Sequence, residues 1–343
     1  MEHVAIDLGG RESQLCVRSC DGTILEEKRC LTRDLGTYLA KRPASRVILE
    51  TCAEAFHVAD RALELGHEVR VVPATLVRSL GVGARRTKTD KRDAQTLSEV
   101  SCRIDLPSVH IASDKSRELK TILNMREALV GARTKLINNV RGYLRGRAIS
   151  IPRGPDAFFK AIDKLLEKKE ATSVLESSIQ RQLRMIKALT VEIEEANKET
   201  AGLAKRDPIC PRLMSVPGIG PITALQYVAC VDDVTRFKSS HHLEAYFGLT
   251  PGENSSSEHR QKLGITKAGS PAMRKYLVQA AWAARRKHGQ HPMLVWTLEV
   301  EKRRGKRIAV VALARKLAGI LFAIWRDGTT YTPKLSARPT TME

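Results

Sequence analysis

The first fifty residues carry a strand pattern that restricts the fold of this chain. Residues 3–8 (HVAIDL) read as a buried strand that ends at two glycines. The alternating residues 14–18 lead to an Asp-Gly turn and another short strand, which is the pattern of a β-hairpin. Helices and strands then alternate along the chain. Three hairpin-like strands followed by this alternation predict a mixed α/β sheet.

The sequence beyond this pattern divides into segments separated by breaks. Strands are predicted over 46–50 and 68–72, and helices over 34–42, 53–65, 90–102 and 114–147. A Pro- and Gly-containing break follows at 151–155, and a second break lies near residue 207. We expect an α/β domain with trailing basic helices over 1–150 and a helical coiled-coil linker over 151–206. A mainly helical C-terminal domain should follow over 207–327, with Gly- and Ser-rich loops between 248 and 270. Residues 328–343 should form a flexible tail.

The linker contains a short apolar seam. Ile179, Leu183, Ile186 and Ile193 follow one another at spacings of four, three and seven residues. Such a seam is typical of a coiled coil, but an ordinary amphipathic helix in a bundle has the same pattern. Both interpretations stay open because Thr190 interrupts the seam.

The charge of the chain predicts a polyanionic partner. Lys and Arg number 58 against 38 Asp and Glu, which gives a formal net charge of +20. Nucleic acid is the first partner to expect and an anionic membrane the second. Residues 133–153 include Arg141 and Arg145 and contain no acid, and residues 259–316 hold fifteen Lys or Arg and two Glu. Such patches attract phosphate without reading a base sequence.

Several classes of protein are disfavoured. Aromatic residues make up 4% of the chain, which argues against a surface that stacks sugars or many bases. No run of eighteen apolar residues is present, and the N-terminus lacks the pattern of a signal peptide. The seven cysteines show no CxxC spacing, as expected for reduced intracellular thiols. We therefore expect a cytoplasmic protein with no membrane partner.

Four carboxylates are candidates for a metal site. Asp7 closes the first strand and Glu50 closes a later one, so both would lie at one edge of a sheet, and Asp90 and Asp93 are spaced to share one helical face. Carboxylate oxygens are the ligands that Mg²⁺ prefers, and such a site can hold two ions for phosphoryl transfer. Each acid alone also fits a cap or turn, and Glu54 could replace Glu50.

The last acidic pair lies inside a dense basic stretch, which suits a metal site that acts on nucleic acid. The cations of this stretch are Arg85, Arg86, Lys88, Lys91 and Arg92.

The segment 88–94 (KTDKRDA), behind an N-terminal strand that ends in Asp, resembles the DEDD recombinases of the insertion-sequence 110 family. These transposases are related to the Piv and MooV DNA invertases. The resemblance implies a RuvC-like domain of RNase H fold in the N-terminal part, with Mg²⁺ held by Asp7, Glu50, Asp90 and Asp93. The family usually has a Gly soon after its Glu, and this chain lacks it after Glu50.

The C-terminal half contains a loop with the pattern of a helix-hairpin-helix. Residues 215–224 (SVPGIGPITA) place Gly218 and Gly220 before a helix start. Glycines let backbone amides approach a phosphate, and a helix N-terminus favours its negative charge. A DNA-backbone contact is therefore predicted, with a tight turn that binds nothing as the alternative.

Residues 247–274 resemble the C-terminal transposase domain of the same family, which has GLxP, a Ser-Ser-Gly and then GxIxKxGxxxLR. The family's nucleophilic serine corresponds to Ser256, with Ser255 as the main rival; Ser257 stands where the family has Gly, and Met273 where it has Leu. A serine hydroxyl needs activation, and nearby only Glu258 and His259 are candidate bases, so the metal is the expected activator. Arg260, Lys267 and Arg274 are candidate nucleic-acid contacts.

The resemblance implies a transposase of a prokaryotic mobile element, working near the nucleoid. Its reaction would be DNA strand exchange through a covalent phosphoserine intermediate. It further implies a structured bridge RNA as guide and a dimer or tetramer, with residues 156–206 as a candidate interface. Two alternatives stay open: a RuvC-like metal nuclease that uses water as nucleophile, and a non-catalytic nucleic-acid-binding protein.

Overall fold

The computed structural model describes residues 1–79, 90–151, 154–167, 173–256, 259–287 and 291–333. The chain forms two compact units, Met1–Ser113 and Asp114–Glu343. The boundary between the units falls before the helix 114–145, because this helix packs on helices of the second unit. The sequence analysis places the same helix in the first domain. The contact boundary therefore differs from the one expected at residue 150.

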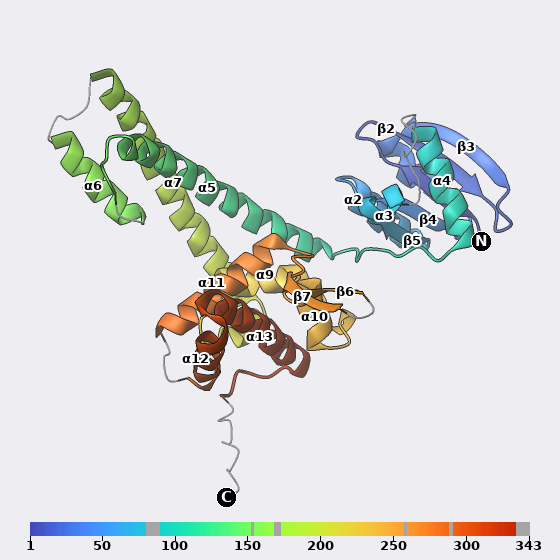
Figure 1. Cartoon of the computed structure of the whole chain (residues 1–343). Coiled ribbons are helices and arrows are strands. Elements are labelled where there is room, and N and C mark those ends of the chain that lie inside the picture. Colours follow the sequence, from blue (N-terminus) through green and yellow to red (C-terminus); the bar gives the residue numbers. More distant parts are fainter. Residues whose placement is uncertain (80–89, 152–153, 168–172, 257–258, 288–290, 334–343) are drawn as a thin grey trace, which may run out of the picture. The chain divides into compact units, whose positions relative to one another are not determined.

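Unit 1 is built on a five-stranded sheet of order β3-β2-β1-β4-β5 (Figure 1). The strands are β1 (His3–Asp7), β2 (Glu12–Arg18), β3 (Ile24–Leu31), β4 (Arg46–Glu50) and β5 (Glu68–Val72). β2 and β3 extend the sheet antiparallel to β1, whereas β4 and β5 run parallel to it. The mixed α/β sheet and its hairpin strands are thereby confirmed.

Helices cover both faces of this sheet. The 3-10 turn η1 (Thr32–Asp34) leads into α1 (Leu35–Leu39), and α2 (Ala55–Glu64), α3 (Ala74–Ser79) and α4 (Asp90–Arg103) follow. Val4 and Ile6 of β1 share one core with α1 and α2, whereas Ala5 shares the other with α3 and α4. This division follows from the two-residue period of a strand, whose successive side chains point to opposite faces.

Unit 2 is mainly helical, as the sequence predicts. Its elements are α5 (Asp114–Arg145), α6 (Pro155–Glu167), α7 (Ser173–Arg206), α8 (Cys210–Leu213), α9 (Pro221–Val231), η2 (Val234–Arg236), α10 (Ser240–Tyr246), β6 (Pro251–Ser256), β7 (His259–Ile265), α11 (Pro271–Lys287), α12 (Pro292–Arg304) and α13 (Lys306–Asp327). Of these, α9 is the central element, because every residue from Thr223 to Val231 is buried.

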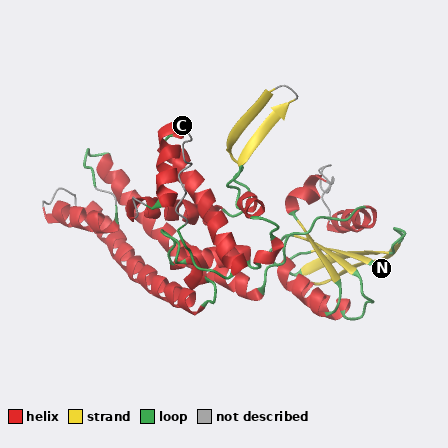
Figure 2. Ribbon diagram, turned by 90° about the horizontal axis from the view of Figure 1, so that it is seen from below, coloured by secondary structure: helices red, strands yellow, loops and turns green. Residues whose placement is uncertain are grey.

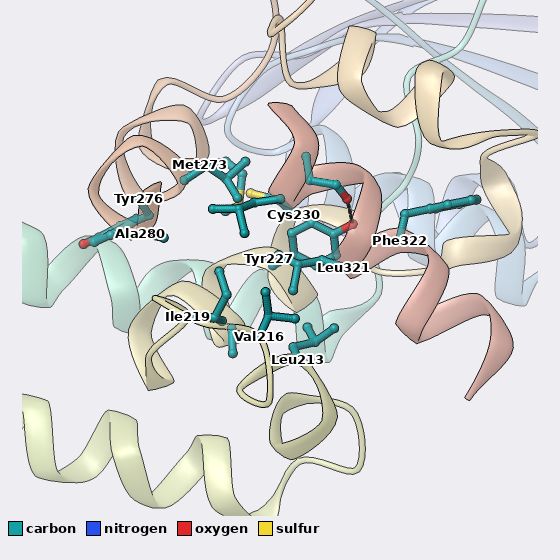
Figure 3. Packing of buried hydrophobic residues seen from close by; sticks show 14 of the residues in the cluster. Leu213, Val216, Ile219, Tyr227, Cys230, Met273, Tyr276, Ala280, Leu321 and Phe322 are labelled. Atoms are coloured by element: carbon teal, nitrogen blue, oxygen red, sulfur yellow. Dashed lines mark hydrogen bonds between the residues drawn. The ribbon is translucent and has the colours of Figure 1, made fainter. Parts of the chain in front are cut away.

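The core around α9 joins segments from much of unit 2 (Figure 3). Tyr227 lies at its centre with no exposed surface, and its hydroxyl donates a hydrogen bond of 3.0 Å to the carbonyl oxygen of Ala318 in α13. This bond satisfies the polar end of a ring that is otherwise packed on apolar side chains, among them Phe247. Burial raises the pKa of the Tyr227 hydroxyl well above its usual value.

The seam of α7 is covered within its own chain. Ile179, Leu183 and Ile186 are buried against α5 and α6. Thr190, which interrupts the seam, accepts a hydrogen bond from Arg133 of α5 at 3.3 Å. These contacts are those of an amphipathic helix in a bundle, the second of the two interpretations, and they leave these side chains little surface for an interface between subunits.

Residues 251–256 and 259–265 form two paired strands, whereas the sequence predicts loops there. β6 and β7 pair antiparallel, and Figure 2 shows the two strands projecting from the helical body. The prediction was wrong because the polar residues of these strands lack the alternation of apolar and polar side chains that marks a half-buried strand.

Among the described helices, α13 has the length and apolar composition of a membrane span, although Arg315 and Lys316 interrupt its apolar residues. Half of its most apolar stretch is buried inside the unit. Leu313, Leu317 and Leu321 belong to the core around α9, so the helix is packed as a core helix is.

Candidate functional site

Two carboxylates lie at the carboxyl edge of the sheet in unit 1. β1 and β4 are parallel neighbours, and Ile6 pairs with Leu49, so the next residues, Asp7 and Glu50, end the two strands side by side. Residues two apart in a strand point to the same face of the sheet, so Asp7 is on the face of Ala5 and Glu50 is on the face of Ile48. Ala5 and Ile48 both pack in the core that α4 covers. Both acids therefore belong to the face that α4 covers.

The direction of α4 brings its first turn to this edge. His3, at the start of β1, lies 2.8 Å from Ser101 near the end of α4, measured from Nδ1 to Oγ. The four residue steps from His3 to Asp7 along the strand span about 13 Å, and the eight steps from Ser101 back to Asp93 along the helix span about 12 Å. Asp93, which is 4% exposed, is thus level with the strand ends.

The turn after Asp7 is held by a small hydrogen-bond network. Thr32 donates a hydrogen bond of 2.6 Å to the carbonyl oxygen of Gly9, and its hydroxyl lies 2.8 Å from that of Ser13. A Cβ on Gly9 would lie 2.4 Å from the carbonyl oxygen of Glu12, so the turn leaves no space for a side chain there. Ser13 and Thr32 were not among the residues predicted from the sequence, because their role depends on the pairing of β2 and β3.

A further carboxylate points toward the same loop. Glu54 precedes α2, and its Oε1 lies 3.7 Å from where a Cβ on Gly10 would be. The turn that carries Gly10 connects Asp7 to β2. Glu54 therefore stays an alternative to Glu50 as the second acid.

The donor set at this edge consists of carboxylate oxygens, which suit Mg²⁺. Among the side chains that the structure describes, no three His, Cys, Asp or Glu residues form a group close enough to hold a metal ion. The backbone of Asp90 begins α4 one turn before Asp93, and its side chain lies outside the described part. The acids thus fit the metal in chemistry, but the described side chains of Asp7, Glu50 and Asp93 do not lie close enough together to form such a group.

Of the basic stretch from Arg85 to Arg92, the structure describes the side chains of Lys91 and Arg92, which lie in the first turn of α4. Lys91 makes an ion pair of 2.8 Å with Glu27 of β3 and thereby lowers the pKa of the Glu27 carboxyl. Arg92 is exposed. Arg85, Arg86 and Lys88 lie outside the described residues.

The candidate serines lie in the hairpin of unit 2. The register pairs Ser256 with His259 and Ser255 with Arg260, so Ser256 is the last residue of β6. The side chains of all four residues, and Ser257 and Glu258 altogether, lie outside the described part. The backbone places the serines near the tip of a hairpin rather than in an irregular loop.

The loop with the helix-hairpin-helix pattern connects the short α8 to α9. Gly218 has φ +88°, and a Cβ there would lie 2.3 Å from the carbonyl oxygen of Ala280. Packing against α11 therefore explains this glycine without a ligand. Gly220, by contrast, caps α9, and a Cβ there would meet no atom of the described residues within 4 Å. It also lines a groove of about 610 Å³.

The groove beside Gly220 is bordered by basic residues of α5 and α11. Arg126, Lys275 and Arg286 line it. Glu127 binds Lys275 and accepts a hydrogen bond of 2.7 Å from the hydroxyl of Tyr276, whose pKa is raised to about 12 by burial and by this carboxylate. The groove combines positive charge with a helix N-terminus, a setting in which phosphate is stabilised.

The other predicted nucleic-acid contacts differ in their surroundings. Arg145 and Lys267 are exposed. Arg141 is half-buried, donates toward the carbonyl oxygen of Gly154 at 3.4 Å and lies over the ring of Phe158. Arg274 donates hydrogen bonds to three backbone carbonyls of its own unit, so its guanidinium is engaged within the protein.

Two family models match the chain. A DEDD transposase model of the IS110 type matches residues 4–148, and the model described as the transposase IS116/IS110/IS902 family matches residues 210–294. The first match covers the sheet of unit 1 and continues through α5, whereas the second covers α8 to the start of α12.

Similar proteins are bacterial transposases. The chain is 28% identical over 337 residues to the transposase for insertion sequence element IS1111A of Coxiella burnetii, with 96% of this chain and 90% of the relative covered. It is 29% identical over 334 residues to the transposase for IS1328 of Yersinia enterocolitica, with 96% and 98% covered. A probable family 20 transposase of Pseudomonas aeruginosa is 29% identical over 313 residues, with 89% and 90% covered. The chain belongs to the IS110 family of DEDD transposases, enzymes that cleave and join DNA.

Proposed function

We propose that this transposase exchanges DNA strands through a serine nucleophile and a metal site of four acids. The observation that carries the proposal is the convergence of Asp7, Glu50 and the first turn of α4 on one face at one edge of the sheet. Asp90 and Asp93 complete the proposed set. Mg²⁺ bound by these oxygens would stabilise the charge that develops on the phosphate.

The sheet supports a RuvC-like, RNase H type of domain. Its order of β3-β2-β1-β4-β5, with three antiparallel strands followed by two parallel ones, fits such a domain. In this arrangement the end of β1 is central, flanked by the end of β4 and covered by the first turn of α4. Phosphoryl-transfer chemistry is therefore assigned to this edge.

Ser256 is the proposed nucleophile. Its hydroxyl oxygen would attack a DNA phosphorus, the phosphodiester P–O bond would break, and the departing oxygen would take up a proton while the phosphate stays on the serine. Attack by another DNA hydroxyl would then form the new phosphodiester and return the serine. His259 is the register partner of Ser256 and a candidate to accept the serine proton.

Nucleic acid is held by the basic surfaces in this proposal. The groove at Gly220, together with Arg145 and Lys267, would contact phosphates, as would Arg85, Arg86, Lys88, Arg92 and Arg260. A structured bridge RNA as guide and a dimer or tetramer belong to the same proposal, as does a place in the cytoplasm near the nucleoid.

The proposal is tested by trapping the covalent intermediate. Purified protein is incubated with Mg²⁺ and a DNA substrate carrying a nick, denatured, and digested, and the modified peptide is mapped by mass spectrometry. We expect phosphoserine–DNA attachment at Ser256 and none in the Ser256→Ala protein, which should still bind nucleic acid. Ser255→Ala is the matched control and should retain the adduct.

The same measurement separates the alternatives. Attachment of the DNA at Ser255 would identify Ser255 as the nucleophile in place of Ser256. Cleavage without any adduct would favour a nuclease that uses water, and binding without Mg²⁺-dependent cleavage would favour a non-catalytic protein.

A further inference from the structure

Two loops at the base of the β6–β7 hairpin are interlocked through their backbones. We call residues 246–250 and 266–270, together with Arg274, the clasp. Gly248 has φ +67°, and a Cβ there would lie 2.1 Å from the carbonyl oxygen of Ala268. Gly269 has φ +71°, and a Cβ there would lie 1.9 Å from the carbonyl oxygen of Tyr246. Only glycine allows the two loops to approach so closely.

Arg274 ties the two loops together. Its Nη1 donates hydrogen bonds to the carbonyl oxygens of Phe247 at 3.1 Å, Ala268 at 2.6 Å and Gly269 at 3.1 Å. The first carbonyl belongs to one loop and the other two to the second. One charged side chain thus bridges both loops, and hydrogen bonds from a charged donor are stronger than those between neutral groups.

The clasp continues directly into the hairpin. The amide of Lys267 donates to the carbonyl oxygen of Gly248 at 3.1 Å, and that of Thr266 to Thr250 at 2.9 Å. The next pair, Pro251 with Ile265, begins the strand ladder. The clasp is therefore the first part of the same ladder that ends at the candidate serines.

The clasp is also fixed to the core of unit 2. Phe247 and Leu249 are buried there, and so is Met273 beside Arg274. The preceding helix α10 is anchored by Glu244, which is 6% exposed and pairs with Arg315 of α13 at 2.5 Å. The base of the hairpin thus has a fixed position. Among the described elements, β6 and β7 have extensive contacts only with each other (Figure 2).

We infer that Arg274 is a positioning residue, which sets the direction of the serine-bearing hairpin through the clasp rather than by contacting nucleic acid. The inference rests on the proposed function, in which a hairpin serine is the nucleophile. A hairpin held only at its base transmits a small change of angle to its tip as a large displacement. A displacement of about 1 Å at a reacting atom can lower a rate by about 100-fold.

The test compares variants that open the clasp with one that removes only a charge. Arg274→Met removes the donors and the charge, Arg274→Lys keeps the charge, and Gly269→Ala leaves all charges unchanged. Arg286→Ala removes a cation from the same helix, α11, at a site that lines the groove and lies outside the clasp. Each full-length protein is assayed for nucleic-acid affinity against salt and for the rate of adduct formation at saturating DNA.

We expect Arg274→Met and Gly269→Ala to form the adduct about 100-fold more slowly at saturating DNA, with the salt dependence of binding unchanged. Arg274→Lys should bind nucleic acid as the wild type does and should recover the adduct rate only in part. Arg286→Ala should do the opposite, with weaker binding, a salt slope smaller by about one, and a normal rate at saturation. If Arg274→Met behaves as Arg286→Ala does, Arg274 is a nucleic-acid contact and the inference is wrong.

Hydrogen exchange of the hairpin amides separates this inference from the proposed function. Opening the clasp should speed exchange in β6 and β7 while the amides of α9 stay protected, which also shows that unit 2 is folded. If the wild-type protein forms no adduct, the serine mechanism fails, but the exchange result still tests the clasp. Unchanged exchange in both Arg274→Met and Gly269→Ala would overturn it.

Discussion

His3 and Ser101 lie 2.8 Å apart, and their contact fixes the direction in which α4 crosses the sheet of unit 1. With the start of β1 beside the end of α4, the end of β1 lies beside the first turn of α4. Asp7 and Asp93 come from segments far apart in sequence, and this antiparallel packing is what brings them to one edge. The buried position of Asp93 is therefore a consequence of how the helix packs.

Asp93→Asn should abolish strand exchange and leave nucleic-acid binding nearly intact. Asn has almost the same volume but supplies no negative charge, so a metal bound at this edge would lose several kcal/mol and the rate at least about 100-fold. Strand-exchange assays with Mg²⁺ and calorimetric titration with Mg²⁺ measure the two effects. Asp105→Asn, an exposed carboxylate beyond the other end of α4, is the control and should act as wild type. Full recombination by Asp93→Asn would remove this residue from the DEDD set.

Glu50→Gln should have the same effect as Asp93→Asn, whereas Glu54→Gln should retain most of the activity. Glu50 continues the strand register beside Asp7, while Glu54 lies at the start of α2 with its carboxylate near the loop at Gly10. The two variants make the same chemical change four residues apart, so each is the control for the other. The reverse result would identify Glu54 as the second acid.

Local patterns predicted much of unit 1 from the sequence. The apolar strands and the spacing of Asp90 and Asp93 depend on residues close together, and the structure has strands and a helix at those positions. The polar strands β6 and β7 gave no such signal, because a hairpin that projects from the core needs no apolar face. The sequence predicts a nucleic-acid contact at Arg274, since it shows the charge of this residue but not the three carbonyls that it binds.

Asp207→Asn should destabilise unit 2 at neutral pH and lose this effect in acid. Burial alone would raise the pKa of Asp207, but hydrogen bonds from Lys115 and from the amides of Ile209 and Cys210 outweigh burial and hold the pKa below its ordinary value of 3.8. Because the folded-state pKa is the lower one, the carboxylate contributes its full stability above pH 3.8, and this is lost as the pH falls through the folded-state pKa.

Urea unfolding measured from neutral pH downward tests this dependence. We expect the free energy of unfolding of Asp207→Asn to be lower by about 1–3 kcal/mol at neutral pH, with the difference from wild type shrinking in acid. Asp114→Asn, whose side chain is 95% exposed, should show little change at any pH. A difference for Asp207→Asn that stays constant into acid would show that the charge of this residue is not what stabilises the unit.

Gly218→Ala and Gly220→Ala should separate packing from nucleic-acid binding in the loop before α9. Gly218 has a positive φ and almost touches Ala280, so alanine there should lower the free energy of unfolding by about 2 kcal/mol. Gly220 has φ −103° and open space toward the described residues around it, so alanine there should lower the free energy of unfolding by less than about 1 kcal/mol, the effect of a poorer N-cap residue. If its backbone contacts a phosphate, the added methyl group should weaken DNA binding by about tenfold, or about 1.4 kcal/mol.

Binding is measured over about 50 to 200 mM salt, where the wild-type affinity should fall by orders of magnitude if six or more phosphates are contacted. Unchanged affinity in Gly220→Ala would favour the tight turn that binds nothing.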